Sequence, residues 1–146
     1  MQITPGTTVS PMNVSSRKLA AVLAERIGSI VPSGLSLRSE ESNIEVRSGG
    51  QVLGGSAALE IIGDEDGRSL SERIETAARS ALSAIQDVII ETTHRPWPGQ
   101  PSADSALPQP DCRIAGDHLL VWFGDEATPV VSIAPIALGA DVSRDA

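Results

Sequence analysis

A long amphipathic helix is the feature that most constrains how this chain folds. Between Ser69 and Thr93, apolar side chains recur at helical spacing and fall in one stripe about 140° wide on a helical wheel. Ser69 and Glu72 have the Ser-x-x-Glu spacing of a capping box, which predicts a start near Leu70, and two prolines end the helix after Thr93. The helix must therefore lie on an apolar layer. Its stripe consists of Ile74, Ala77, Ala78, Ala81, Leu82, Ile85, Val88 and Ile89.

The charged residues Glu75 and Arg79 lie on the opposite face of this helix. Their i,i+4 spacing predicts a solvated ion pair worth about 0.3 kcal/mol.

A shorter helix is expected before it. It begins after Ser15 or Ser16 and runs to about Ile30, where a proline and a glycine follow. Arg26 falls inside its apolar stripe. We interpret Arg26 either as a snorkelling arginine at the rim of the core or as an anchor for an acidic ligand or partner. The stripe consists of Leu19, Val22, Leu23, Ile27 and Ile30.

From Leu35 the apolar spacing changes to two, which predicts β-strands. Apolar and polar residues alternate in 35–38 and 44–47, on either side of a turn. This pattern predicts a β-hairpin with one solvent-exposed face. A third strand is expected at 57–62, after a glycine-rich stretch that lacks any phosphate-loop pattern and indicates a flexible connection or bulge. Residues 119–123 and 130–136 predict a second hairpin, whose last strand contains a proline and therefore lies at an edge or is bulged.

These elements predict an α+β fold in one domain. We expect a two-layer arrangement, in which an antiparallel sheet of about five strands packs against two helices. A chain of 146 residues buries roughly two thirds of its unfolded surface, so it needs no disulfide. The domain spans 15–138, with flexible tails at 1–14 and 139–146. Within it, the proline-rich segment 94–113 is expected to cross the surface in extended form.

Charge and composition limit the partners. A formal net charge of −8 argues against nucleic acid, because the phosphate backbone would repel the chain. The N-terminus lacks the pattern of a signal peptide and no apolar run is long enough to span a bilayer, so we expect a cytoplasmic protein with no membrane partner. Ten of the eleven basic residues are arginine, which indicates a GC-rich bacterial genome.

One acidic cluster suggests a calcium loop but has the wrong register. Asp64, Glu65 and Asp66 precede Gly67, yet with that glycine in its loop position the bidentate ligand would be Arg73. The cluster is interpreted as a solvated turn before the long helix. Neither histidine has a metal-ligand spacing, so we predict no metal and no cofactor.

Cys112 is the only cysteine, which excludes an intrachain disulfide and fits a reducing compartment. Together with His118 and a carboxylate it would form the most plausible nucleophilic site in the sequence, because a thiolate needs a nearby base. A buried, inert thiol is the commoner role of a single cysteine.

The aromatic residues are Trp97, Trp122 and Phe123 alone. In the strand 119–123, Phe123 points to one face and Trp122 to the other, and both faces are apolar. Trp122 is therefore covered within the monomer by Trp97 and the proline-rich segment, or it forms an interface. We predict a homodimer through Trp122 and its hairpin. The candidate binding residues are Trp97, Trp122, Phe123 and Arg26.

The order of these elements over 15–138, with the acidity and small size, resembles that of the small acidic secretion-chaperone-like α/β domains. The resemblance implies a dimeric, non-catalytic protein. The chain departs from that pattern because its last residues are too short and polar for a C-terminal helix.

Three classes of function follow. The leading hypothesis is a non-enzymatic adaptor or chaperone-like protein with a protein client. One alternative is a small-ligand-binding domain with Trp97 over a cavity roofed by the proline-rich segment. The other is a hydrolase or transferase with a site near Cys112 and His118, drawing on His94, Asp64 and Asp66.

Overall fold

The computed structural model describes residues 14–59, 61, 69–98 and 107–139. Two helices and seven strands are present in these residues. The elements are α1 (Ser16–Gly28), β2 (Leu35–Glu40), β3 (Asn43–Ser48), β4 (Gln51–Ala58), α2 (Leu70–Thr93), β5 (Pro110–Ala115), β6 (His118–Gly124), β7 (Pro129–Ser132) and β8 (Ile136–Ala137).

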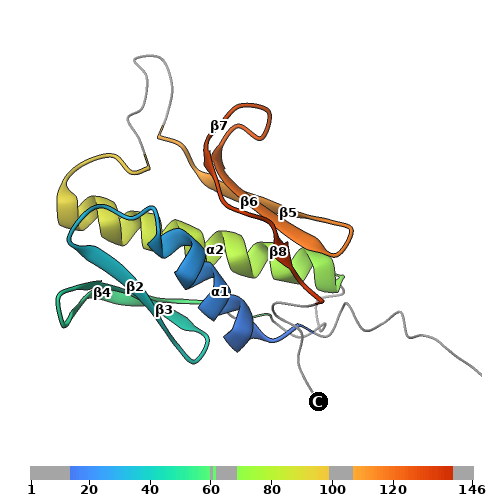
Figure 1. The fold of residues 1–146 in the computed structure, drawn as a ribbon, viewed down its shortest axis with the longest axis horizontal. Helices are drawn as coiled ribbons and strands as arrows, with labels where there is room; N and C mark the ends of the chain where they lie inside the picture. The colour runs from blue at the N-terminus through green and yellow to red at the C-terminus, as the bar shows by residue number, and fades with distance from the viewer. Residues whose placement is uncertain (1–13, 60, 62–68, 99–106, 140–146) are drawn as a thin grey trace, which may run out of the picture.

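The long helix α2 runs through the middle of the molecule, with one sheet on each side (Figure 1). Strands β2, β3 and β4 form one antiparallel sheet, and β5, β6 and β7 form the other, in which β8 also pairs with β6. The α+β class and the antiparallel pairing are confirmed. The strands form two sheets instead of the single sheet of about five strands that we expected, because α2 lies between β2–β4 and β5–β8, and no described strand of one group pairs with a strand of the other.

Both helices begin as the sequence predicts. Ser15 caps α1 by accepting a hydrogen bond from the backbone of Lys18, and Ser69 and Glu72 form the complete capping box of α2. The apolar stripe of α2 is buried except for the partly buried Val88. It contributes to a single hydrophobic core that also contains side chains of α1 and of both sheets.

The expected hairpin 35–47 is present as β2 and β3. The third strand, however, begins earlier than expected, at Gln51. Gly49, with φ +63°, makes the tight turn that precedes it, and Gly54, with φ +58°, lies where the register of β3 and β4 shifts. Of the two roles that we expected for these glycines, a flexible connection or a bulge, the structure has the bulge, together with a tight turn.

The second sheet differs most from the expectation. Strand β5 begins inside the segment 94–113 that we expected on the surface, and four residues of this segment are buried: Trp97, Pro98, Pro108 and Pro110. The expected strand 130–136 is divided into β7 and β8, which pair with different parts of β6.

The structure also bears on the ends of the chain and on the acidic turn. Residues 1–13 and 140–146 lie outside the described residues, as does the acidic cluster from Asp64 to Gly67. Val14, placed in the expected tail, is 7% exposed and belongs to the core. No helix in the described ranges has the length and apolar character needed to cross a membrane.

Candidate functional site

Trp97 and Phe123 are core residues in contact with each other. Their rings meet edge to face, with centroids 5.2 Å apart and planes inclined by 70°. The indole Nε1 of Trp97 donates a hydrogen bond of 3.1 Å to the carbonyl oxygen of Ile30. Both side chains are buried, so in this structure they stabilise the packing of the two helices against the second sheet.

Gln86 on α2 was missed by the sequence analysis. It is 1% exposed, and its Nε2 donates to the carbonyl oxygens of Trp97 at 3.0 Å and Pro108 at 2.6 Å. The side chain thus holds together the two described ends of the proline-rich segment. A signal was available, because Gln86 lies four residues after Leu82 and three before Ile89, within reach of the buried stripe.

Arg26 connects α1 to the second sheet. Its Nη1 donates to the carbonyl oxygens of Ala134 at 2.6 Å and Pro135 at 3.1 Å, in the link between β7 and β8. These contacts favour the interpretation of an arginine at the rim of the core. Its role as an anchor for an acidic partner stays a prediction.

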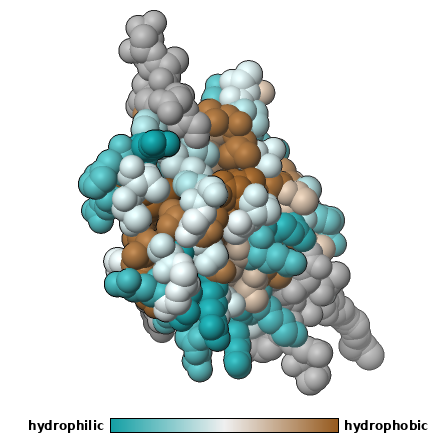
Figure 2. Space-filling model, turned by 60° about the vertical axis from the view of Figure 1, so that its left-hand side comes forward, coloured by the Kyte–Doolittle hydropathy of each residue, from teal (hydrophilic) through white to brown (hydrophobic). Residues whose placement is uncertain are grey.

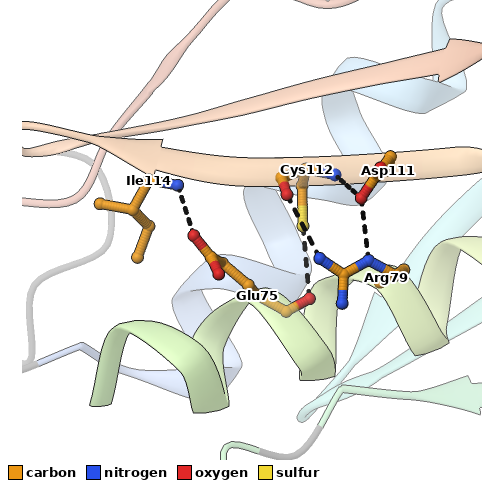
Figure 3. Close-up of polar contacts among 5 residues, drawn as sticks. All are labelled: Glu75, Arg79, Asp111, Cys112 and Ile114. Atoms are coloured by element: carbon orange, nitrogen blue, oxygen red, sulfur yellow. Dashed lines mark hydrogen bonds and ion pairs between the residues drawn. The ribbon is translucent and has the colours of Figure 1, made fainter. Parts of the chain in front are cut away.

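Glu75 and Arg79 do not form the solvated pair that their spacing suggests. Both reach from α2 to the outer edge of β5 (Figure 3). The carboxylate of Glu75 accepts the backbone N–H of Ile114 at 2.7 Å, while Arg79 donates to the carbonyl oxygen of Cys112 at 3.3 Å and to the carboxylate of Asp111 at 2.9 Å. The prediction of a solvated ion pair was wrong because a helical wheel shows which residues share a face of the helix, but not whether a strand packs against that face.

The edge of β5 is closed along its length. Pro110 has no N–H, the N–H of Cys112 donates to the Asp111 carboxylate at 2.8 Å, and that of Ile114 donates to Glu75. An edge strand covered by a helix in this way cannot pair with another strand.

Cys112 is a buried thiol. Its Sγ donates to the carbonyl oxygen of Glu75 at 3.3 Å. Burial is the largest cause that raises its pKa, to about 12; nearby Arg79 lowers the pKa, while Glu75 and Asp111 raise it further. The hydrogen bond with Asp111 in turn raises the pKa of Arg79 above its ordinary value. A thiol of this kind is a poor nucleophile at neutral pH.

The structure does not bring the candidate catalytic residues together. His118 is exposed at the start of β6, where its Nδ1 lies 2.8 Å from Asp117, whereas Cys112 pairs with Val121 further along the strand and points towards α2. His94 is the C-cap of α2. Within the described part of the chain, no three potential metal ligands form a group.

Trp122 lies on the outer face of the second sheet. It is 6% exposed but does not belong to the core cluster, and its Nε1 has no hydrogen-bond partner among the described residues. Of the two covers that we expected, Trp97 contacts Phe123 on the opposite face of β6, and residues 99–106 of the proline-rich segment lie outside the described residues. Only two large hydrophobic side chains in the described ranges are exposed, Val130 at 52% on β7 and Val52 at 39% on β4.

Two further features lie on the surface. Figure 2 shows apolar side chains gathered in the middle of one face, with hydrophilic side chains around them. A separate hollow of about 280 Å³ lies between α1 and the turn from β2 to β3. Side chains of both charge signs line the hollow, which gives it no clear ligand preference. They are Arg17, Ala21, Ser39, Glu40 and Glu41.

Comparison with known proteins finds no matching family model, no similar curated protein and no similar solved structure. The resemblance to secretion chaperones therefore rests on the order of the elements, the acidity and the small size of the chain.

Proposed function

We propose that this chain is a non-enzymatic protein-binding domain, adaptor-like or chaperone-like, that holds an extended segment of a partner along strand β7. The observation that carries the proposal is a difference between the two edges of one sheet. The β5 edge is closed by α2 and its side chains. Strand β7, by contrast, has β6 as its only strand neighbour among the described residues, and its Val130 is the most exposed large hydrophobic residue of the described ranges.

The register indicates which backbone groups β7 offers. Ser132 lies opposite Trp122, and the N–H of Ile133 donates to the carbonyl oxygen of Val121 at 3.2 Å. Hydrogen-bonded and non-hydrogen-bonded pairs alternate in an antiparallel ladder, so the N–H and C=O of Ser132 point away from β6. A partner strand could bond to them by strand addition.

The dimensions of β7 limit this contact. It has four residues and begins with a proline, so the backbone bonds alone would be few. Binding would depend on side chains beside the edge, among which Val130 is the exposed large hydrophobic side chain of β7. A short contact of this kind suits a reversible adaptor.

The polar groups of the interior support a non-enzymatic role. Gln86 joins the ends of the proline-rich segment, Glu75 and Arg79 cap β5, and Cys112 donates to the helix backbone. Each of these groups has a structural hydrogen bond, and none of them lines the hollow between α1 and the turn from β2 to β3.

Site-specific photo-crosslinking tests the proposal. A photoreactive amino acid replaces Val130 in one variant and Val52 in a matched control, since both are exposed valines on edge strands of different sheets. We expect Val130 to give a discrete adduct with another protein in lysate of the source organism, and Val52 to give none. The second half of the test is Ser132→Pro in the Val130 variant, which removes one outward N–H and should reduce the adduct. Equal labelling from both positions would contradict the proposal.

A further inference from the structure

We propose that the outer face of strands β5 to β7, centred on Trp122, is a self-association surface that the Arg113–Glu126 ion pair covers in the single chain. The occupant of this face is a second copy of the chain. The proposal concerns the face of the sheet and does not depend on the proposed binding of a partner along the β7 edge.

The register places the ion pair beside Trp122. Arg113 pairs with Leu120, which lies two residues before Trp122 on the same face of β6. Its Nε is 2.5 Å from the Oε2 of Glu126, which lies in the turn after Gly124. Because Arg113 lies at the level of Leu120 and Glu126 follows the end of β6, the two side chains meet between these levels, near Trp122. Both of its side chains are about half exposed, at 50% and 47%.

This cover is easily exchanged. A half-exposed ion pair in solvent adds little to stability, so opening it costs little. The indole N–H beneath it has no acceptor among the described residues, although a buried donor normally has one. A partner surface with a hydrogen-bond acceptor and apolar side chains could bond to the indole N–H and pack against its ring. Tryptophans at the centre of protein interfaces are typical hot spots.

The charges of this face suit a second copy as the occupant. Two chains that each carry a net charge of −8 repel one another unless the surfaces in contact are locally neutral. On this face Asp111 is balanced by Arg79, and Arg113 by Glu126. In a two-fold dimer, Arg113 of one copy can pair with Glu126 of the partner subunit and the reverse, so no charge is left unpaired when Trp122 is uncovered.

Light scattering over a concentration series tests this proposal on the full chain. We expect a wild-type dimer at micromolar concentration, and a dissociation constant raised about 30-fold or more by Trp122→Ala. Arg113→Glu should also give a monomer, because the new carboxylate repels that of Glu126 both within a chain and between chains. Arg113→Glu combined with Glu126→Arg restores both pairings and should restore the dimer.

Arg38→Glu is the matched control, since Arg38 pairs with Glu40 on an exposed strand of the other sheet. It should leave the dimer intact. Where Trp122→Ala does not fold, the charge variants still decide the question. A monomeric wild type would overturn the proposal, as would equal dissociation by Arg38→Glu. A monomer that still forms adducts through Val130 would overturn this inference alone and leave the proposed function standing.

Discussion

The carboxylate of Glu75 on α2 lies 2.7 Å from the backbone nitrogen of Ile114 on β5, so a helix side chain fills the place of a neighbouring strand. Arg79, one helical turn later, donates a hydrogen bond to the carbonyl oxygen of Cys112. These two backbone groups flank Arg113 and point the same way. In a parallel sheet, a single residue of the neighbouring strand would form hydrogen bonds with both of these groups, the carbonyl oxygen of Cys112 and the N–H of Ile114. The side chains of α2 therefore take over the hydrogen bonds that a further strand would make with β5.

Glu75→Ala should destabilise the protein by about 1 kcal/mol, because the N–H of Ile114 then loses its acceptor beside a helix that limits access to water. Glu75→Gln keeps a carbonyl acceptor and should cost less. Glu91→Ala, at an exposed position near the other end of α2, is the control. Urea denaturation measures all three. A loss for Glu91→Ala as large as that for Glu75→Ala would show that the β5 contact adds nothing.

Gln86→Ala should cost more, about 2 to 3 kcal/mol, because it leaves two carbonyl oxygens without their donor in a buried position and creates a small cavity. Gln109→Ala is the matched control, since Gln109 is exposed and its side chain donates to the carbonyl oxygen of the nearby Leu107, while the backbone bond that it accepts from Gly124 is kept. Thermal unfolding followed by tryptophan fluorescence gives the comparison, and Trp97 reports locally on the segment that Gln86 holds. Equal melting temperatures for the two variants would exclude a stabilising role for Gln86.

Gly54→Ala should destabilise by at least about 1 kcal/mol, for two reasons. The residue has φ +58°, which an L side chain adopts at a cost, and a Cβ there would meet the Cγ2 of Val88 at 3.0 Å. Gly50→Ala is the control, because a Cβ at Gly50 meets nothing within 4 Å and its φ is not positive. If both variants unfold at the same urea concentration, β4 does not approach α2 as closely as the structure has it.

The sequence predicted those elements whose signals are local. The capping box of Ser69 and Glu72, the apolar stripe of α2 and the hairpin of β2 and β3 follow from spacing alone. Strand β5 was missed although Gly116 and Asp117 form a two-residue hairpin turn between Ala115 and His118, because the prolines before it dominated the interpretation.

The arrangement in space could not be predicted in the same way. Periodicity assigns Glu75 and Arg79 to a polar face of α2, but whether that face meets water or a strand depends on where α2 lies relative to the second sheet. The burial of Trp97 and Gln86 likewise depends on contacts between segments far apart in the sequence. The surroundings of these side chains therefore could not be derived without the fold.

Cys112 should be unreactive in the folded protein and reactive once it unfolds. At pH 8, a pKa of about 12 leaves about one thiol in ten thousand ionised. Since Cys112 is the only cysteine, its modification by a thiol reagent measures this site alone. We expect reaction within minutes in concentrated urea and very slow reaction in buffer. Rapid labelling of the folded protein would contradict the burial of the thiol.

The same pKa shift makes stability depend on pH in a defined window. Burial raises the thiol pKa from its ordinary value of 9.0 to about 12, so between these values the unfolded chain loses the proton while the folded chain keeps it. The free energy of unfolding therefore falls as the pH rises from about 9 towards 12, and below pH 9 this thiol contributes no slope. Cys112→Ala lacks the titrating group and should flatten the decline relative to wild type, in denaturation midpoints measured from pH 8 to 11. Parallel declines in the two proteins would assign the loss of stability to other groups.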